Sequence, residues 1–361
     1  MQRRDFLKTA AVTGVTTAVI GPWSDTAQTA AKAETQGALL ARALPQWRGF
    51  NLLEKFNGKN SPFRESDFAW LADWGFDFVR LPMDYKMWTD VADPYKFDEK
   101  SLGEIDEAIE FGRKHGVHVS LNLHRAPGYT VAHPAEKLNL WEDEEAQRQF
   151  DFQWSHFARR YKGISPEQVS FDLVNEPANV TSRAYAKVAR RAVKAIRAID
   201  PNRLVISDGL QWGREPVFEL ADLGVAQSTR GYDPMQISHY QASWVNSRNW
   251  PEPTWPQRRG SQVIDRDWLY KDRIEPWKKL EAAGCGVHVG EWGCYNKTPH
   301  EVALRWMEDF LALWKEAGWG WALWNFRGQF GIFDSGRSDV TYEAYRGHQL
   351  DRKMLDLLLT F

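Results

Sequence analysis

Two glutamates stand at the ends of segments that the sequence predicts to be buried strands. Glu176 closes the apolar segment VSFDLVNEP at 169–177, and Glu291 closes GVHVGEW at 286–292. A single carboxylate at a strand end often only accepts hydrogen bonds from an arginine or from backbone N–H groups. A pair that shares one site can cleave a glycosidic bond, because one carboxylic acid protonates the leaving oxygen while the other attacks the anomeric carbon or activates water. Burial and a negative neighbour would keep the acid protonated near neutral pH.

The elements that must position this pair alternate along the chain. Segments 102–116 and 182–199 repeat apolar residues every three or four positions, which predicts amphipathic helices, and a further helix is expected at 350–361. The short apolar runs between them predict eight strands, at 48–52, 76–82, 117–124, 169–177, 203–209, 235–241, 286–293 and 320–326. Eight strand–helix units in roughly 330 residues predict a single α/β domain, a (β/α)8 TIM barrel. An open doubly wound sheet is the alternative, but no Gly-rich phosphate loop follows the first strand.

Alternation along the strands predicts which side chains face the barrel interior. In 117–124 the odd-numbered residues are apolar and the even-numbered ones are polar, so we expect the apolar set to face the helices. By the same counting, Glu176 shares a face with Asp172, and Glu291 shares a face with Val289. Both carboxylates are therefore expected over the barrel mouth.

Two long connections, 241–262 and 327–349, leave the C-terminal ends of predicted strands, where barrel active sites are built. The first connection carries Trp244, Trp250 and Trp255, and the whole chain has 19 tryptophans. About half of the aromatic residues are expected in the core. The remainder suit flat ligands with apolar faces, such as sugar rings.

Five motifs, taken together, resemble glycoside hydrolase family 5, the cellulase-like barrels. They are RLP at 80–82, LNLHRAPGY at 121–129, FDLVNEP at 171–177, HVGEWG at 288–293 and GWALWNF at 320–326. Their order and spacing match the family, and the resemblance covers roughly residues 48–359. Asn-Glu-Pro alone is a modest signal, whereas the ordered set is highly specific.

The resemblance implies a retaining mechanism with Glu176 as the acid/base and Glu291 as the nucleophile, their carboxyl groups about 5–5.5 Å apart. It also implies a set of substrate-binding residues: Arg80 beside the nucleophile, Asn175 at the substrate 2-hydroxyl, His124 and His239 around the reacting sugar, and Trp324 under that sugar at subsite −1. Further candidates for sugar stacking are Trp88, Trp141, Trp212 and Trp292.

The chain departs from the family pattern in two places. The family has a tyrosine two residues after the histidine of the sixth strand, where the tyrosine bonds the nucleophile. If His239 is that histidine, position 241 is Gln and Tyr240 follows directly. Tyr240 is thus a substrate-binding candidate whose role depends on where the strand ends, and Tyr295 could replace it. The second departure is Arg125, where many relatives have another histidine.

We expect from the resemblance a retaining endo-β-1,4-glucanase that hydrolyses a β-linked polysaccharide. The alternatives are a β-mannanase or a β-1,3- or mixed-linkage glucanase, endo- or exo-acting, because the fold does not select among these substrates. A transglycosylase would pass the same covalent intermediate to a sugar. A non-catalytic carbohydrate-binding barrel is a more distant alternative, since such a protein is expected to lack one carboxylate.

Composition narrows the class of partner. The formal net charge is −2 and no block of like charge stands out, which argues against nucleic acid or an anionic membrane as the ligand. We expect a neutral carbohydrate substrate, no cofactor and no metal, and a monomer. Cys285 and Cys294 flank one predicted strand about 30 Å apart in extended chain, too far for a disulfide.

The first 33 residues resemble a twin-arginine export signal. Arg3 and Arg4 precede a weakly apolar run at 9–20, which is too short to span a bilayer. Gln2 stands where serine or threonine is usual. The alternative is a tail with a chance arginine pair. We expect cleavage near Ala33, export to the periplasm or the medium, and a catalytic domain at 34–361.

Overall fold

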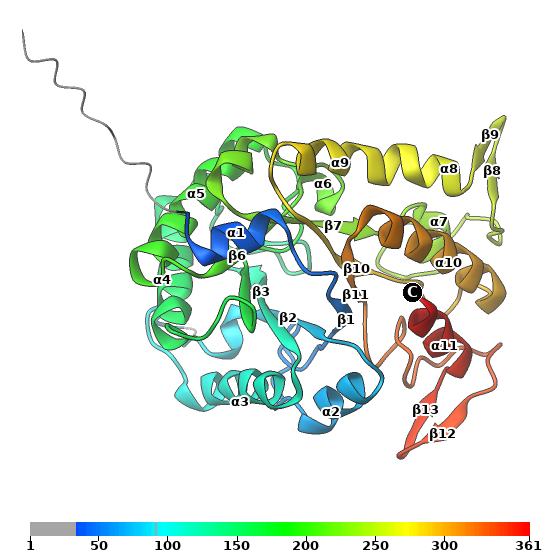
Figure 1. Ribbon diagram of the computed structural model, residues 1–361, viewed down its shortest axis with the longest axis horizontal. Coiled ribbons are helices and arrows are strands. Elements are labelled where there is room, and N and C mark those ends of the chain that lie inside the picture. Colours follow the sequence, from blue (N-terminus) through cyan, green and yellow to red (C-terminus); the bar gives the residue numbers. More distant parts are fainter. Residues whose placement is uncertain (1–33, 91) are drawn as a thin grey trace, which may run out of the picture. The chain divides into compact units, whose positions relative to one another are not determined.

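Eight parallel strands close into one barrel in the computed structural model, which describes residues 34–90 and 92–361 (Figure 1). The barrel strands are β1 (Arg48–Asn51), β2 (Phe78–Asp84), β3 (His118–Ala126), β5 (Val169–Asp172), β6 (Leu204–Asp208), β7 (Ala226–Gly231), β10 (Val287–Trp292) and β11 (Gly320–Leu323). Each pairs with its neighbours in parallel, and the β2–β3 pairing closes the ring. The predicted (β/α)8 fold is confirmed, whereas the predicted export signal, residues 1–33, lies outside the described part of the chain.

Helices surround the barrel on the outside. They are α2 (Glu65–Asp73), α3 (Glu99–His115), α4 (Glu144–Arg160), α5 (Ser182–Ile199), α9 (Glu275–Ala282), α10 (His300–Ala317) and α11 (Arg352–Thr360), with the short elements α6 (Leu210–Gly213), α7 (Met235–Ser238), α8 (Arg266–Leu269), η1 (Tyr85–Met87), η2 (Phe218–Leu223) and η3 (Tyr270–Ile274). The preceding helix α1 (Gln36–Arg42) lies across the N-terminal end of β6, where Gly37 touches the backbone of Asn202 and Arg203 (Figure 1). This helix therefore covers the end of the barrel opposite the expected active site.

Local signals set the bounds of these helices. Asp98 caps α3 by accepting hydrogen bonds from the N–H groups of Lys100 and Ser101, and Gly116 ends it in a left-handed conformation (φ 68°). Thr181 caps α5 by accepting from the N–H of Ala184. The predictions of both helices from their apolar period are confirmed.

The strands face the interior as their alternation predicts. Val119, Leu121 and Leu123 pack into the core beneath the helices, and all three are fully buried. His118 points the other way, into the barrel, where its ring stacks on Trp47 with centroids 3.8 Å apart. An apolar layer thus fills the lower barrel, and the polar side chains lie above it toward the C-terminal ends of the strands.

The predicted sixth strand, 235–241, is wrong. Residues Met235–Ser238 form the single helical turn α7, and the sixth barrel strand is β7, Ala226–Gly231. The sequence of β7 is AQSTRG, and all six residues are buried. A polar strand of this kind gives no apolar run, because its buried side chains are satisfied by hydrogen bonds and not by apolar packing.

Short hairpins extend from the connections at the C-terminal ends of the strands. The strands β8 (Gln257–Arg259) and β9 (Gln262–Ile264) pair after β7, and β12 (Glu343–Tyr345) and β13 (His348–Leu350) pair after β11. Both hairpins project on the right of Figure 1. A two-residue strand, β4 (Tyr129–Thr130), folds back onto β3. These connections surround the mouth of the barrel.

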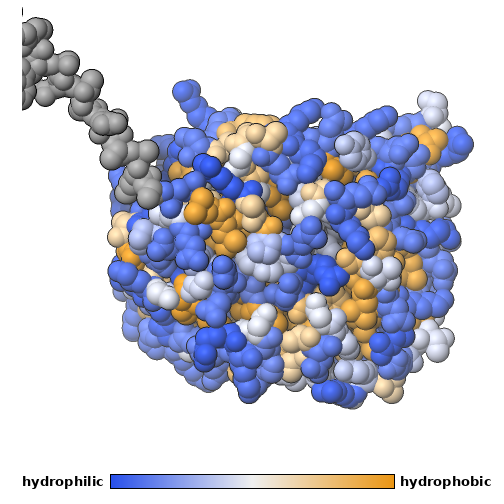
Figure 2. Space-filling view, viewed as in Figure 1, coloured by the Kyte–Doolittle hydropathy of each residue, from blue (hydrophilic) through white to orange (hydrophobic). Residues whose placement is uncertain are grey.

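The face in Figure 2 is largely hydrophilic, with smaller hydrophobic areas between the polar groups. Cys285 and Cys294 are both buried with free thiols. Among the helices formed by residues 34–90 and 92–361, none combines the length and apolar character needed to cross a bilayer.

Candidate active site

Glu291 faces the barrel interior because β10 contains a bulge. The register with β7 pairs Val289 with Thr229 and then Glu291 with Arg230, so Gly290 is an extra residue. Counted by simple alternation, Glu291 would face the helices together with Val289. The expected position of Glu291 is thus correct, but the bulge causes it. Asn51 holds the bulge through a hydrogen bond from its Nδ2 to Gly290 O at 3.0 Å.

Arg80 binds the carboxylate of Glu291 from below. Its Nη1 lies 2.5 Å from Glu291 Oε1, its Nε donates to Asp172 Oδ2 at 2.7 Å, and its Nη2 donates to Asn175 Oδ1 at 2.9 Å. Glu291 is only 3% exposed and Arg80 only 1%. These contacts hold the Glu291 carboxylate in a fixed position at the barrel mouth.

Glu176 also faces the barrel mouth, but a turn after β5 directs it there, not a bulge. The strand β5 ends at Asp172, and Glu176 has a left-handed backbone with φ 51°. Its N–H donates to Asp208 Oδ2 at 2.8 Å, and its C=O accepts from the hydroxyl of Tyr129 at 2.7 Å. A non-glycine residue in this conformation costs about 1–3 kcal/mol and persists where surrounding contacts enforce it. The turn, and not strand alternation, therefore directs both Asn175 and Glu176 into the site.

The surroundings of Glu176 favour its protonated form. Burial raises the pKa of its carboxyl group, and the negative charge of Glu291 raises that pKa further. Arg230 opposes both effects, because its Nε donates to Glu176 Oε1 at 3.0 Å. A raised pKa is what an acid catalyst needs in order to hold a proton near neutral pH.

The tyrosine that contacts Glu291 is Tyr232. Its hydroxyl lies 3.3 Å from Glu291 Oε2, and it follows Arg230 by two residues at the end of β7. Neither Tyr240 nor Tyr295 fills this role: Tyr240 lies beyond α7, and the Tyr295 hydroxyl instead accepts from Gln329 Nε2 at 3.3 Å. The expectation for Tyr240 failed because the sixth strand was assigned one element too late.

His239 lies beside the site without being on a strand. It follows α7, its ring centroid is 5.1 Å from that of Tyr232, and its Nδ1 is 2.8 Å from Ser238 Oγ. Burial lowers the pKa of His239 to about 4, so its imidazole is neutral at ordinary pH. His239 thus packs against Tyr232, whose hydroxyl contacts Glu291.

His124, Asn175 and Trp324, each a candidate for contact with the reacting sugar, lie together in the structure. His124 Nε2 lies 3.4 Å from Asn175 Nδ2, and the rings of His124 and Trp324 stack with centroids 5.5 Å apart. Burial and the positive charges of Arg80 and Arg230 lower the pKa of His124. Its buried Nδ1 has no hydrogen-bond partner among the described residues. A neutral imidazole with a free nitrogen is suited to hydrogen bonding with a sugar hydroxyl.

Three residues central to the site were not predicted from the sequence: Arg230, Asp208 and Tyr232. Arg230 is 3% exposed and its guanidinium contacts both oxygens of Asp208, with Nη1 to Oδ1 at 3.1 Å. The usable signal was the segment TRGYDP at 229–234, in which Tyr232 stands two residues after a polar residue. In that reading, Arg230 stands where the family pattern has its histidine.

Arg125, the other departure, is paired within its own loop region. Its Nη1 donates to Glu136 Oε1 at 2.6 Å and to Pro134 O at 2.8 Å, and its Nε lies 3.2 Å from Asp84 Oδ2. It is 5% exposed. These pairings anchor the connection after β3 instead of leaving a free charge at the reacting centre.

The tryptophans proposed for sugar stacking differ in their exposure to solvent. Trp88 and Trp292 are fully buried and belong to the core, so their predicted role in stacking is wrong. Trp141 is half-buried. Trp212 is 46% exposed and Trp244 is 54% exposed, which leaves their faces open to a ligand. Of the other two tryptophans in the 241–262 connection, Trp255 is buried with its Nε1 bonded to Asp309, and Trp250 is half-buried.

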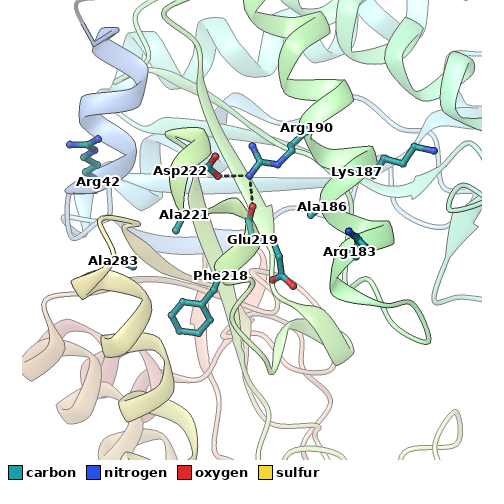
Figure 3. A pocket seen from close by; sticks show the side chains of 10 residues that line it. All are labelled: Arg42, Arg183, Ala186, Lys187, Arg190, Phe218, Glu219, Ala221, Asp222 and Ala283. Atoms are coloured by element: carbon teal, nitrogen blue, oxygen red, sulfur yellow. Dashed lines mark hydrogen bonds and ion pairs between the residues drawn. The ribbon is translucent and has the colours of Figure 1, made fainter. Parts of the chain in front are cut away.

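A separate hollow lies on the outside of the barrel, between α5, η2 and the end of α9 (Figure 3). Its volume is about 920 Å³, and its lining includes Arg183, Lys187 and Phe218. Arg190 crosses it to donate to Glu219 O at 2.5 Å and to the carboxylate of Asp222. None of the predicted site residues lines this hollow, so it is distinct from the catalytic centre.

Comparisons with known proteins identify the family of this chain. The family model described as Cellulase (glycosyl hydrolase family 5) matches residues 31–329. Endoglucanase C of Acetivibrio thermocellus is 27% identical over 305 residues, covering 77% of this chain and 88% of that protein. A crystal structure described as a glycoside hydrolase has a TM-score of 0.83 at 43% identity, covering 87% of this chain and 99% of that one. Endoglucanase Cel5A of Thermotoga maritima shares the fold, with a TM-score of 0.71 at 24% identity over 90% of this chain and 98% of that one. The chain is therefore a glycoside hydrolase and belongs to glycosyl hydrolase family 5.

Proposed function

We propose that this glycoside hydrolase is a retaining endo-β-1,4-glucanase with Glu176 as acid/base and Glu291 as nucleophile. The observation that carries the assignment is a single guanidinium that reaches both carboxyl groups. Arg230 Nε lies 3.0 Å from Glu176 Oε1, and its Nη2 lies 3.6 Å from Glu291 Oε1. Two carboxyl groups that share one guanidinium, one favouring the protonated form and one bound by Arg80, support the proposal of a double-displacement site.

The reaction proceeds in two steps. In the first, Glu291 attacks the anomeric carbon while Glu176 gives its proton to the leaving oxygen, and a glycosyl–enzyme ester forms. In the second, Glu176 takes a proton from water, the water oxygen attacks the same carbon, and the bond to Glu291 breaks. Tyr232 and Arg80 both contact Glu291 and stabilise the carboxylate that leaves in the second step.

The reacting sugar is proposed to lie over Trp324, beside His124 and Asn175. Trp324 presents a partly exposed indole, packed edge-on by Phe56 with ring centroids 5.1 Å apart. The amide of Asn175 is fixed from two sides, because its Oδ1 accepts from both Arg80 Nη2 and Arg230 Nη2 at 2.9 Å. With its oxygen occupied in this way, the Nδ2 of Asn175 is directed as a donor toward the substrate 2-hydroxyl.

A β-1,4-linked glucan is the proposed substrate because the matching family model is described as Cellulase and a relative of similar length is named an endoglucanase. Mannan, β-1,3-glucan and mixed-linkage glucan are the alternative substrates, and the same two-step reaction would cleave them.

The test is reducing-sugar release by residues 34–361 from a soluble cellulose derivative, mixed-linkage glucan, β-1,3-glucan and mannan. A rapid fall in viscosity would establish endo action. Highest activity on β-1,3-glucan or mannan would overturn the substrate assignment, while leaving the reaction class unchanged.

Trp212 is proposed to bind the leaving-group side of the substrate. It lies just after β6, in a left-handed turn with φ 51° at Gln211, 61° at Trp212 and 72° at Gly213. The strand β6 adjoins β5 on the side of Glu176, away from Trp324 at the end of β11. Because the acid protonates the leaving oxygen, sugars on its outer side belong to the leaving group.

Replacing Trp212 by alanine should therefore raise KM for cellopentaose about tenfold, the equivalent of about 1–1.5 kcal/mol of lost stacking. Hydrolysis of an aryl cellobioside, whose leaving group is a single ring, should change much less. Initial-rate kinetics on both substrates measure the difference. The matched control is Phe218→Ala, an exposed aromatic residue in the hollow on the outside of the barrel, which should alter neither. An equal change on the two substrates would contradict the assignment.

Export through the twin-arginine pathway to the periplasm or the medium is also proposed, on the strength of Arg3, Arg4 and the short apolar run that follows. In this view residues 34–361 are the mature catalytic domain. Fractionation of cells that express the full chain, with Arg3→Lys/Arg4→Lys as the blocked variant, would test the route.

A further inference from the structure

Arg230 has no counterpart in the chemistry that the resemblance implies. It stands two residues before the tyrosine that contacts the nucleophile, where the family pattern has a histidine. A histidine at this place can be neutral, whereas a guanidinium always carries a charge. The substitution therefore adds a permanent positive charge beside the acid/base.

The guanidinium of Arg230 is held in one orientation by contacts on every nitrogen. Its Nε donates to Glu176, its Nη1 donates to Asp208 Oδ1 at 3.1 Å and to Ser228 Oγ at 2.9 Å, and its Nη2 contacts Asp208 Oδ2 and Asn175. The side chain is 2% exposed. Asp208 also accepts the N–H of Glu176, so it fixes the backbone of the acid/base and the guanidinium together.

Two glycines make room for this side chain. A Cβ at Gly213 would lie 2.6 Å from Arg230 Cγ, and a Cβ at Gly290 would lie 3.0 Å from Arg230 Nη1 and overlap Ser228 Oγ. Gly213 belongs to the left-handed turn that carries Trp212, and Gly290 is the extra residue of the bulge that turns Glu291 inward. The site is thus shaped around an arginine at position 230.

Charged and titratable groups face Glu176 from several elements. They are Asp208 from β6, Arg230 from β7, Tyr232 just after β7, Glu291 from β10, and Tyr129 from β4, with Arg80 from β2, Asp172 from β5 and His124 from β3 below and beside them. Within the described residues, the positive charge that directly contacts Glu176 is that of Arg230. In the glycosyl–enzyme, Glu291 is an ester and no longer contributes a charge.

We propose that Arg230 is a positioning residue for the second step: it holds Glu176 ionised in the glycosyl–enzyme so that the carboxylate can take the proton of the attacking water. The inference rests on the double-displacement function proposed above. In this step, water gives its proton to Glu176 and the water oxygen bonds to the anomeric carbon. The ester bond to Glu291 breaks, and its electrons return to the Glu291 carboxylate.

The experiment uses an aryl cellobioside with a dinitrophenolate leaving group, which needs no proton in the first step. A burst of dinitrophenolate shows that the second step limits kcat. The acid limb of the kcat profile then reports the ionisation of Glu176 alone, because Glu291 is esterified. In Arg230→Gln this limb should move to higher pH by about one unit or more, since a contacting positive charge lowers a carboxyl pKa by about 1–3 units.

Two variants separate charge from structure. Arg230→Lys keeps the charge and should leave the acid limb close to its wild-type position while lowering kcat through the lost contacts. Arg203→Gln removes another buried arginine, which pairs with Asp200 at the opposite end of the barrel, and should lower stability without moving the limb.

A lower kcat in Arg230→Gln with an unmoved acid limb would overturn the proposal and leave the double-displacement function standing. Failure of the double-displacement proposal would be recognised by a different result, namely activity that survives in Glu291→Gln. If Arg230→Gln does not fold because Asp208 is left unpaired, Arg230→Gln/Asp208→Asn is compared with Asp208→Asn. The same upward shift between those two variants supports the proposal, and no shift overturns it.

Discussion

Replacing Glu291 by glutamine is expected to abolish turnover, with kcat/KM on cellulose oligosaccharides and on aryl cellobiosides falling by at least about 10⁴-fold. Glutamine has the same shape as glutamate, but its amide cannot form the glycosyl ester. Initial rates measure the loss. The fold should survive, because Asn51 still holds the bulge and Arg80 retains its bonds to Asp172 and Asn175.

Sugar binding should also survive in Glu291→Gln, which calorimetry with cellotetraose would show. The matched control is Glu110→Gln on the exposed surface of α3, where the same chemical change should leave kcat/KM unaltered. Near wild-type activity in the Glu291 variant would remove the basis for the nucleophile assignment, and with it the retaining mechanism.

Replacing Glu176 by glutamine should lower activity by an amount that depends on the leaving group of the substrate. Cellulose oligosaccharides need a proton on the leaving oxygen, so kcat/KM on them should fall by about 10²–10⁴-fold. Dinitrophenyl cellobioside needs none, so its first step should stay close to wild type and a burst should precede slow turnover. Added azide should restore the second step, because this anion attacks the ester without a base.

The same variant should also change the pH profile. The pKa of Glu176 is raised, so the wild-type enzyme holds the catalytic proton below that pKa and loses it as the pH rises. The alkaline limb of kcat/KM on unactivated substrates therefore belongs to Glu176 and should disappear in Glu176→Gln. An equal loss on activated and unactivated substrates, with the limb retained, would rule out the acid role.

The sequence predicts seven of the barrel strands because their cores are apolar runs bounded by turns. It misplaces the sixth because β7 carries Gln227, Ser228, Thr229 and Arg230, whose burial depends on partners that are distant in sequence. Gln227, for example, exchanges two hydrogen bonds with the backbone of Val217. Apolar periodicity cannot detect such a strand.

The sequence predicts the positions of the two candidate carboxylates from the strand ends, but it does not predict the cause of their orientation. Strand alternation alone would turn Glu291 outward, and the bulge at Gly290 reverses it. Glu176 lies beyond the end of its strand and depends on a left-handed φ. Both features are local departures from regular geometry, and each is enforced by a hydrogen bond from another strand, which a single segment of sequence does not reveal.

The burial of Arg80 and Arg230 among their carboxylate partners has a consequence for the influence of dissolved ions. At physiological ionic strength, screening acts over about 8 Å of water, and it acts much less on charges enclosed by protein. Surface pairs such as Arg113–Glu110, with side chains 58% and 57% exposed, weaken as salt is added. The charged side chains of the candidate site are 1–4% exposed for Arg80, Arg230 and Glu291 and 14% exposed for Glu176, so they respond to one another more than to dissolved ions. We therefore expect the protonation of Glu176 to depend much less on salt concentration than the surface ion pairs do.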